Sequence, residues 1–165
     1  MDARRKRKLK FSLEIGPGDS PVTLRKKNRE SIMLDNNLSE LKYIGLRSDA
    51  NLLLADASHI PLKKESVSEI DCRMFPAFEF FDLKDAEKMV REAKRALKER
   101  GTFTLSVPDY EVSRTKKLMV KNGFELSKVK LMTNPKKMTT IEKDLRGKNG
   151  LLVMTFKKKR GLLFG

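Results

Sequence analysis

The sequence predicts an α/β fold with a mostly parallel, seven-stranded sheet of the doubly wound, Rossmann-like type. Short apolar segments alternate with segments of helical periodicity along the chain. The apolar segments are hydrophobic nearly throughout, which is typical of parallel strands buried on both faces. The 165 residues have the usual size of one domain. We therefore expect a single domain over residues 1–165, with a basic arm over residues 1–8.

Each element follows from its local pattern of apolar residues, glycines and prolines. Strands are expected over residues 9–15, 31–35, 51–55, 67–74, 102–107, 124–132 and 151–157. Helices are expected over residues 36–46, from 82 to the end at 101, and over 111–121, with a short helix at best in 20–28 and an aromatic loop over 74–81. No helical pattern separates the last two strands, so one of them is expected to run antiparallel at the sheet edge.

The clearest helix begins at Asp82, which can cap its first turn. One apolar stripe has the i, i+3, i+4, i+7, i+11 spacing and contains Ala86, Met89, Val90, Ala93 and Leu97. Gly101 follows as a helix-terminating C′ residue. The pattern predicts a helix from residue 82 to 101 that packs its stripe on the sheet.

Basic residues concentrate toward the two ends of the chain. The formal charge of +15 divides into +6 over residues 1–30, −2 over 31–110 and +11 over 111–165. Such ends could form a surface that tracks phosphates, so RNA is a candidate partner, although solvated charge is the simpler interpretation. No segment is long and apolar enough to span a bilayer, and we expect no membrane partner.

Cysteine and histidine usage excludes several kinds of site. Cys72 is the single cysteine and His59 the single histidine, too few for a disulfide or a His/Cys metal cluster. We expect no metal, a buried thiol at Cys72, an ordinary loop histidine at His59 and a cytoplasmic location. No catalytic base stands out.

Acidic residues close the first three predicted strands, where a glycine turn also lies. Glu14 precedes the turn Gly16-Pro17-Gly18, and Asp35 and Asp56 follow the next two strands. In an open α/β sheet the ligand lies beyond the carboxyl ends of the strands, and an acid about 20 residues after the turn meets ribose hydroxyls. These residues predict a nucleoside site.

The turn lacks the features of a phosphate-binding loop. A dinucleotide fingerprint starting at Gly16 requires glycine at position 21, which is Pro21, and the G-x-x-x-x-G-K-[ST] pattern is absent. A ligand with an adenosine and a positive charge is therefore favoured over a dinucleotide.

From Leu13 to Asp109 the chain resembles the class I S-adenosylmethionine-dependent methyltransferases, specifically the small, type 11-like domains. The segment 14–20, EIGPGDS, resembles the family's E/D-x-G-x-G-x-G motif, with Ser20 in place of the last glycine. Similar matches are Leu34-Asp35, the segment 55–62, ADASHIPL, resembling D-A-x-x-L-P-F, the segment 66–71 before strand four, and the segment 92–103, EAKRALKERGTF. The resemblance implies S-adenosylmethionine as cofactor.

The resemblance also implies site residues. Glu14, Gly16, Pro17 and Gly18 would shape the methionine side of the pocket, Asp35 would hold the ribose and Asp56 would read the adenine. The remaining predicted cofactor-binding residues are Asn36, Ala57 and Arg73. Transfer from a sulfonium needs mainly proximity and alignment of donor and acceptor.

Two departures from the family pattern leave alternatives open. Only residues 1–13 precede Glu14, where family members carry helices that close over the substrate. The Arg73-Met74-Phe75-Pro76 sequence also differs from the N-P-P-Y of base N-methyltransferases. The methyl acceptor, RNA among the candidates, stays open. The alternatives are an inactive methyltransferase-like module that binds RNA or protein, and a subunit whose substrate site is completed by a protein partner or a second copy.

Overall fold

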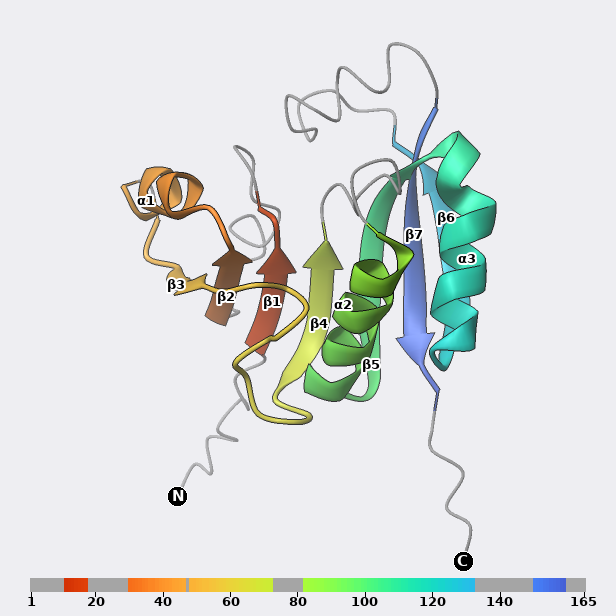
Figure 1. Cartoon of the computed structure of the whole chain (residues 1–165), viewed down its shortest axis with the longest axis horizontal. Helices are drawn as coiled ribbons and strands as arrows, with labels where there is room; N and C mark the ends of the chain where they lie inside the picture. Colours follow the sequence, from red (N-terminus) through yellow and green to blue (C-terminus); the bar gives the residue numbers. More distant parts are fainter. Residues whose placement is uncertain (1–10, 18–29, 47, 73–81, 133–149, 160–165) are drawn as a thin grey trace, which may run out of the picture.

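The computed structural model describes residues 11–17, 30–46, 48–72, 82–132 and 150–159, which form one seven-stranded sheet of order β3-β2-β1-β4-β5-β7-β6 (Figure 1). The strands are β1 Phe11–Ile15, β2 Glu30–Asp35, β3 Asn51–Leu54, β4 Val67–Cys72, β5 Leu97–Pro108, β6 Phe124–Leu131 and β7 Leu151–Lys158. The helices are α1 Leu38–Gly45, α2 Leu83–Ala96 and α3 Val112–Lys121, and a 3-10 turn, η2 Asp109–Glu111, precedes α3. The predicted fold class is confirmed.

Five strands, β1 to β5, pair in parallel, and β7 runs antiparallel to both of its neighbours, β5 and β6. The antiparallel strand that the sequence predicted at the edge of the sheet is β7, which lies between β5 and the edge strand β6. The predicted helix in 20–28 and the aromatic loop over 74–81 lie outside the described residues.

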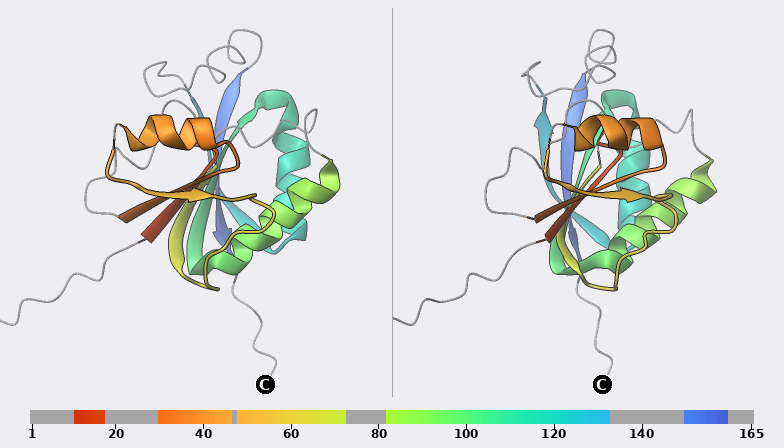
Figure 2. Two further views of the ribbon diagram at one scale, coloured as in Figure 1. Left: turned by 60° about the vertical axis from the view of Figure 1, so that its left-hand side comes forward. Right: turned by 90° about the vertical axis from the view of Figure 1, so that its left-hand side faces the viewer.

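Helices α2 and α3 lie together on one face of the sheet, and α1 contacts β2 and β3 (Figures 1 and 2). The predicted stripe of α2 is confirmed, since its apolar residues are buried. Within the core, Phe103 and Phe124 meet edge to face, with ring centroids 5.8 Å apart. Both rings are fully buried, and each contributes about 1.5–3 kcal/mol to folding. In the part of the chain described, no helix is long and apolar enough to cross a membrane.

The predicted beginning of α2 is confirmed, and its predicted end is wrong. Asp82 caps the helix by accepting a hydrogen bond from the Lys84 amide at 3.2 Å. The helix ends at Ala96, because the segment entering β4 occupies its last carbonyls. The Ser66 amide donates to the Ala96 carbonyl, and the Glu65 amide to that of Arg95, both at 2.9 Å. The next residue, Leu97, has an extended backbone and pairs with Val67 at the start of β4.

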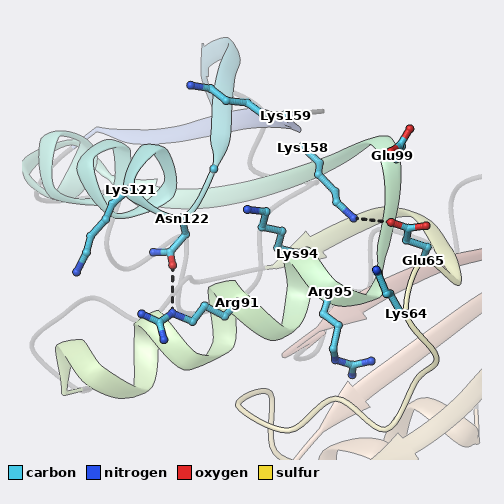
Figure 3. Close-up of a pocket in the computed structure, with 11 residues that line it drawn as sticks. Lys64, Glu65, Arg91, Lys94, Arg95, Glu99, Lys121, Asn122, Lys158 and Lys159 are labelled. Carbon is cyan, nitrogen blue, oxygen red and sulfur yellow. Dashed lines mark hydrogen bonds and ion pairs between the residues drawn. The ribbon is translucent and has the colours of Figure 1, made fainter. Parts of the chain in front are cut away.

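Gly101 is a buried residue inside β5 and not a helix cap. The pairing with β4 jumps from Leu97 to Thr102, so the residues between them form a bulge, where Arg100 has a φ of 58°. A Cβ at Gly101 would lie 2.6 Å from Leu97 Cγ, so glycine is needed here for space. Lys158 ties this bulge to β7, since its Nζ donates to the Leu97 carbonyl at 2.6 Å and reaches Glu65 Oε1 at 3.4 Å (Figure 3).

Candidate functional site

The carboxyl ends of β1, β2 and β3 lie side by side and are joined by backbone hydrogen bonds beyond the strands. The Gly16 amide donates to the Leu34 carbonyl at 2.9 Å. The Ala55 amide donates to the Asp35 carbonyl at 3.0 Å. The turn after β1 and the acids after β2 and β3 therefore occupy one edge of the sheet, as the sequence predicted.

Gly16 adopts a left-handed conformation, with a φ of 59°. Glycine takes this conformation without strain, whereas other residues adopt it rarely, so the residue type fits the turn. The next residue, Pro17, is buried. The backbone thus leaves β1 in a sharp turn without a side chain at its bend. Gly18 and Arg73, two predicted site residues, lie outside the described part of the chain.

The two strand-end aspartates stabilise their own loops with one carboxylate oxygen each. Asp35 Oδ1 accepts a hydrogen bond from the Asn37 amide at 2.9 Å, and Asp56 Oδ1 accepts one from the Ser58 amide at 2.7 Å. Within the described residues, Asp35 Oδ2 has no hydrogen bond, and the Asp56 carboxylate is bound by the side chain of Ser58 as well as by its amide. Each acid is therefore fixed in orientation by its loop, and its oxygens keep lone pairs that can accept from a ligand.

Hydrogen bonds from Ser58 are the main reason that the pKa of Asp56 lies below its usual range. Burial opposes this shift, and the nearby charges of His59 and Lys88 add smaller effects that lower the pKa. Asp56 is thus ionised at neutral pH and acts as a hydrogen-bond acceptor. His59 lies in an exposed loop, and its Nδ1 is 2.9 Å from Ser58 Oγ.

Two buried acids lie beneath the turn, on β1 and β4. Glu14 is fully buried and Asp71 is 6% exposed, and their Cα atoms are partners in the β1–β4 register. Both side chains make polar interactions. Burial, together with the charges of Glu14 and Asp71, raises the pKa of the Cys72 thiol to about 12. The predicted buried thiol is confirmed, and this edge of the sheet carries negative charge.

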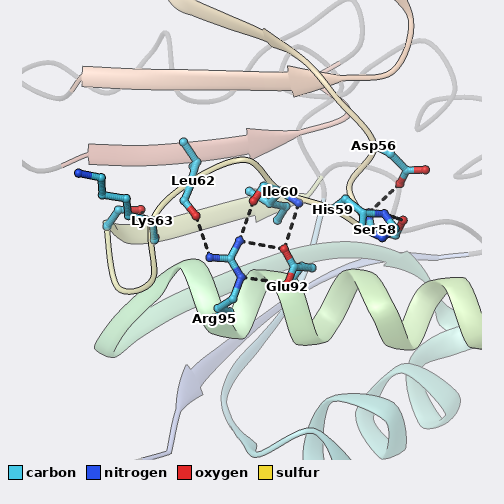
Figure 4. Close-up of polar contacts among 9 residues, drawn as sticks. Asp56, Ser58, His59, Ile60, Leu62, Lys63, Glu92 and Arg95 are labelled. Carbon is cyan, nitrogen blue, oxygen red and sulfur yellow. Dashed lines mark hydrogen bonds and ion pairs between the residues drawn. The ribbon is translucent and has the colours of Figure 1, made fainter.

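The loop over residues 55–66, which carries Asp56 and Ala57, is clamped onto α2 (Figure 4). Arg95 donates through Nη1 to the Leu62 carbonyl at 2.7 Å and through Nη2 to the Ile60 carbonyl at 2.6 Å. Glu92 accepts the Ile60 amide at 3.1 Å and binds Arg95 at 2.8 Å. Arg95 is the main cause of the lowered pKa of Glu92. The clamp fixes the loop on the sheet face that α2 covers.

The predicted strand-end residues lie at the ends of β2 and β3, whereas the residues that support their loops were not among the predicted site residues. Asn36 is exposed after Asp35, and Ala57 packs against the core. In the sequence, Glu92 and Arg95 stand out only as part of the segment 92–103, although their i, i+3 spacing of opposite charges signals an ion pair. Asp71 has no such local signal, because its position beside Glu14 depends on strand pairing. The described residues hold no group of three or more potential metal ligands.

Comparisons with known proteins agree with this architecture. Among solved structures, a protein from Methanosarcina mazei described as an S-adenosylmethionine-dependent methyltransferase has a TM-score of 0.72 at 14% identity, over 93% of this chain and 94% of that one. The complex of the Haloferax volcanii Trm112 methyltransferase activator with a protein described as a methyltransferase has a TM-score of 0.71 at 15% identity, over 92% and 83% of the two chains.

A third similar structure limits what the fold implies. The [4+2]-cyclase SpnF has a TM-score of 0.70 at 12% identity, over 93% of this chain and 76% of that one. Fold alone therefore does not fix the reaction.

A search of curated proteins gave no sequence match. The sequence profile described as "Methyltransferase domain" matches residues 13–105, more than half of the chain. The chain belongs to this methyltransferase family, and its fold is that of the class I S-adenosylmethionine-dependent methyltransferases.

Proposed function

We propose that this protein binds S-adenosylmethionine at the carboxyl edge of β1, β2 and β3 and transfers its methyl group to an acceptor. The observation that carries the proposal is the alignment of Gly16, Asp35 and Asp56 at that edge, which backbone hydrogen bonds from Gly16 to Leu34 and from Ala55 to Asp35 hold in place. The same edge binds nucleosides in open α/β sheets.

The residues present fit the cofactor chemically. Asp35 Oδ2 can accept ribose hydroxyls, and the Asp56 carboxylate can accept the adenine amino group, because hydrogen bonds within their own loops already hold both side chains in place. The left-handed turn at Gly16 leaves room for the backbone to approach the methionine part. Glu14 and Asp71 supply negative charge on the side where a cationic ligand would lie. The bound cofactor would supply an electrophilic methyl group on a sulfonium.

Isothermal titration calorimetry with S-adenosylmethionine and S-adenosylhomocysteine tests the proposal. We expect binding with a Kd below ~1 mM. Asp35→Asn should weaken S-adenosylhomocysteine binding about tenfold or more, because the charged acceptor of the ribose is lost. Asp49→Asn, at an exposed position before β3 begins and away from the carboxyl ends of the strands, is the matched control and should bind as wild type. Absence of binding by folded wild-type protein would overturn the proposal.

For the methyl acceptor we propose RNA. The formal charge of +15 supports this choice, since it attracts a polyanion independently of sequence. Incubation of cellular RNA with methyl-labelled S-adenosylmethionine tests it. The proposal is supported if RNA becomes labelled with wild-type protein and stays unlabelled with the Asp35→Asn variant. Label found only in protein or small molecules contradicts it.

A further inference from the structure

A basic groove of about 770 Å³ lies at the end of the sheet where β4 begins. This end is opposite the carboxyl ends of the parallel strands, where the candidate cofactor site lies. The groove is formed where β4 begins, where α2 and α3 end, and where the antiparallel β7 ends (Figure 3). The residues that line it are Lys64, Glu65, Arg91, Lys94, Arg95, Glu99, Lys121, Asn122, Gly123, Lys158 and Lys159. Seven of these side chains are cationic and two are anionic.

The cations of the groove divide into two kinds. Arg95, Arg91 and Lys121 are paired with glutamates on α2, and Lys158 with Glu65. Lys64, Lys94 and Lys159 have no hydrogen bond or ion pair from their side chains to the rest of the described chain. These three ammonium groups are therefore the cations of the groove without a carboxylate partner in the described chain.

Lys94 is the central member of this unpaired set. It projects from α2 toward the turn between α3 and β6, where a Cβ added to Gly123 would meet its Nζ. Gly123 has a φ of 82°, so the turn there accommodates glycine, and the absence of a side chain leaves room for the lysine. Lys64 and Lys159 are both exposed, and they come from the segments before β4 and after β7. The three ammonium groups thus come from three different elements.

The lining favours a nucleic-acid backbone over a protein partner. No residue that lines the groove is aliphatic or aromatic, whereas protein interfaces have an apolar core. An aromatic platform for stacking bases is equally missing from the lining. Interfaces with nucleic acids are polar and strongly positive, and lysines bind phosphates as point charges. The groove therefore matches the repeated phosphates of a backbone and does not read bases.

We propose that this groove binds the phosphodiester backbone of RNA through Lys64, Lys94 and Lys159. This deepens the proposed function, on which it rests in taking RNA as the partner. The groove lies at the end of the sheet where β4 begins, and the candidate cofactor site lies at the opposite end, beyond the carboxyl ends of β1, β2 and β3. The six-residue strand β4 alone is about 20 Å long, so a phosphate backbone bound in the groove is held apart from the cofactor site.

Fluorescence anisotropy with a 20-base-pair RNA duplex, measured over a range of salt concentrations without cofactor, tests the proposal. The triple variant Lys64→Gln, Lys94→Gln, Lys159→Gln should bind at least about tenfold more weakly and lower the salt slope by about three, one for each lysine. The matched control is Lys42→Gln, Lys116→Gln, Lys117→Gln, which removes the same charge from exposed positions outside the groove. It should retain most of the affinity and the salt slope.

Further arms of the assay decide the chemistry. A DNA duplex of the same sequence tells whether the groove accepts any phosphodiester backbone or RNA alone. Whichever result the DNA gives, loss of RNA binding by the triple groove variant supports the proposal. Equal losses in the groove and control variants would overturn it, as would displacement of RNA by polyglutamate at equal charge. Loss of all binding on neutralising residues 4–8, with the groove variant unaffected, would also overturn it. The double variant Lys64→Gln, Lys159→Gln serves if the triple variant does not fold by circular dichroism.

Cofactor binding is measured separately by calorimetry. Failure of the groove proposal is therefore distinguishable from failure of the proposed cofactor site. Wild-type protein that binds S-adenosylhomocysteine but not RNA overturns the groove proposal and the choice of RNA as acceptor, and leaves the proposed cofactor site standing.

Discussion

The guanidinium of Arg95, near the end of α2, holds the carbonyl oxygen of Ile60 at 2.6 Å from Nη2. Ile60 is 2% exposed and lies in the loop that leads from β3 to β4. No helix crosses over between these two parallel strands, so the loop itself packs against α2. The position of this loop depends on a few polar contacts. Arg95 therefore helps to hold the loop that carries Asp56 in place.

We predict that Arg95→Lys destabilises the protein by about 1–2 kcal/mol. A lysine keeps the charge and the apolar stem but cannot donate to Ile60, Leu62 and Glu92 at once, so a carbonyl loses its partner. Urea unfolding followed by circular dichroism measures the loss. Amide hydrogen exchange should also become faster at Ile60, whose amide is held by Glu92.

Arg91→Lys is the control on the same helix. Its ion pair with Glu87 is exposed on the arginine side, at 68%, and such surface pairs contribute little. We expect a change below about 0.5 kcal/mol. Equal effects of the two substitutions would mean that the contacts of Arg95 with the loop do not stabilise the fold.

Acid should weaken the same clamp through Glu92. The pKa of Glu92 is lowered in the folded state, mainly by the hydrogen bond with Arg95. Its stabilising effect is therefore complete above the unfolded pKa near 4.5 and is lost as the pH falls through the lower, folded value. The Glu92→Gln variant cannot ionise, so it lacks this stabilisation at every pH.

We predict that wild-type protein is more stable than Glu92→Gln at pH 7, and that the difference shrinks below about pH 4.5. Urea unfolding of both proteins at a series of pH values between 3 and 7 measures it, with the range chosen around the titration of a carboxyl group. A difference that stays constant over the whole range would show that the ionisation of Glu92 is not coupled to folding.

Much of the fold was predictable because its signals are local. The apolar runs of β1, β2 and β3 end in acids, and α2 has both a cap at Asp82 and a continuous stripe. Once these strands pair in parallel, their carboxyl ends lie at the same end of the sheet, so no contact between distant side chains had to be predicted. The candidate site was therefore predictable as far as it consists of strand ends.

The parts that could not be predicted depend on contacts between distant residues. The end of α2 is set by Ser66 and Glu65, some 30 residues earlier, which bind the last carbonyls of the helix. Gly101 matched a helix-terminating residue by its position in the sequence, yet it lies in a bulge of β5. Asp71 and Glu14 face one another in register only once the two strands pair. No local pattern carries this information.

The bulge itself can be tested at Gly101. In Gly101→Ala the new methyl group would lie 2.6 Å from Leu97 Cγ and 2.9 Å from the Lys98 carbonyl oxygen, so the bulge or the Leu97 side chain must move. Leu97 is fully buried, and overpacking of this kind costs about 1–3 kcal/mol. Thermal and urea unfolding should both report the loss.

Gly150→Ala is the matched control for this prediction. A Cβ there has its nearest neighbour, Leu131 Cδ1, at 3.6 Å, an ordinary contact. We expect its free energy of unfolding to stay within about 0.5 kcal/mol of wild type, as for most surface substitutions. If instead Gly101→Ala were as well tolerated as Gly150→Ala, residues 97–102 would not form the tight bulge, and the original prediction of a helix reaching position 101 would regain support.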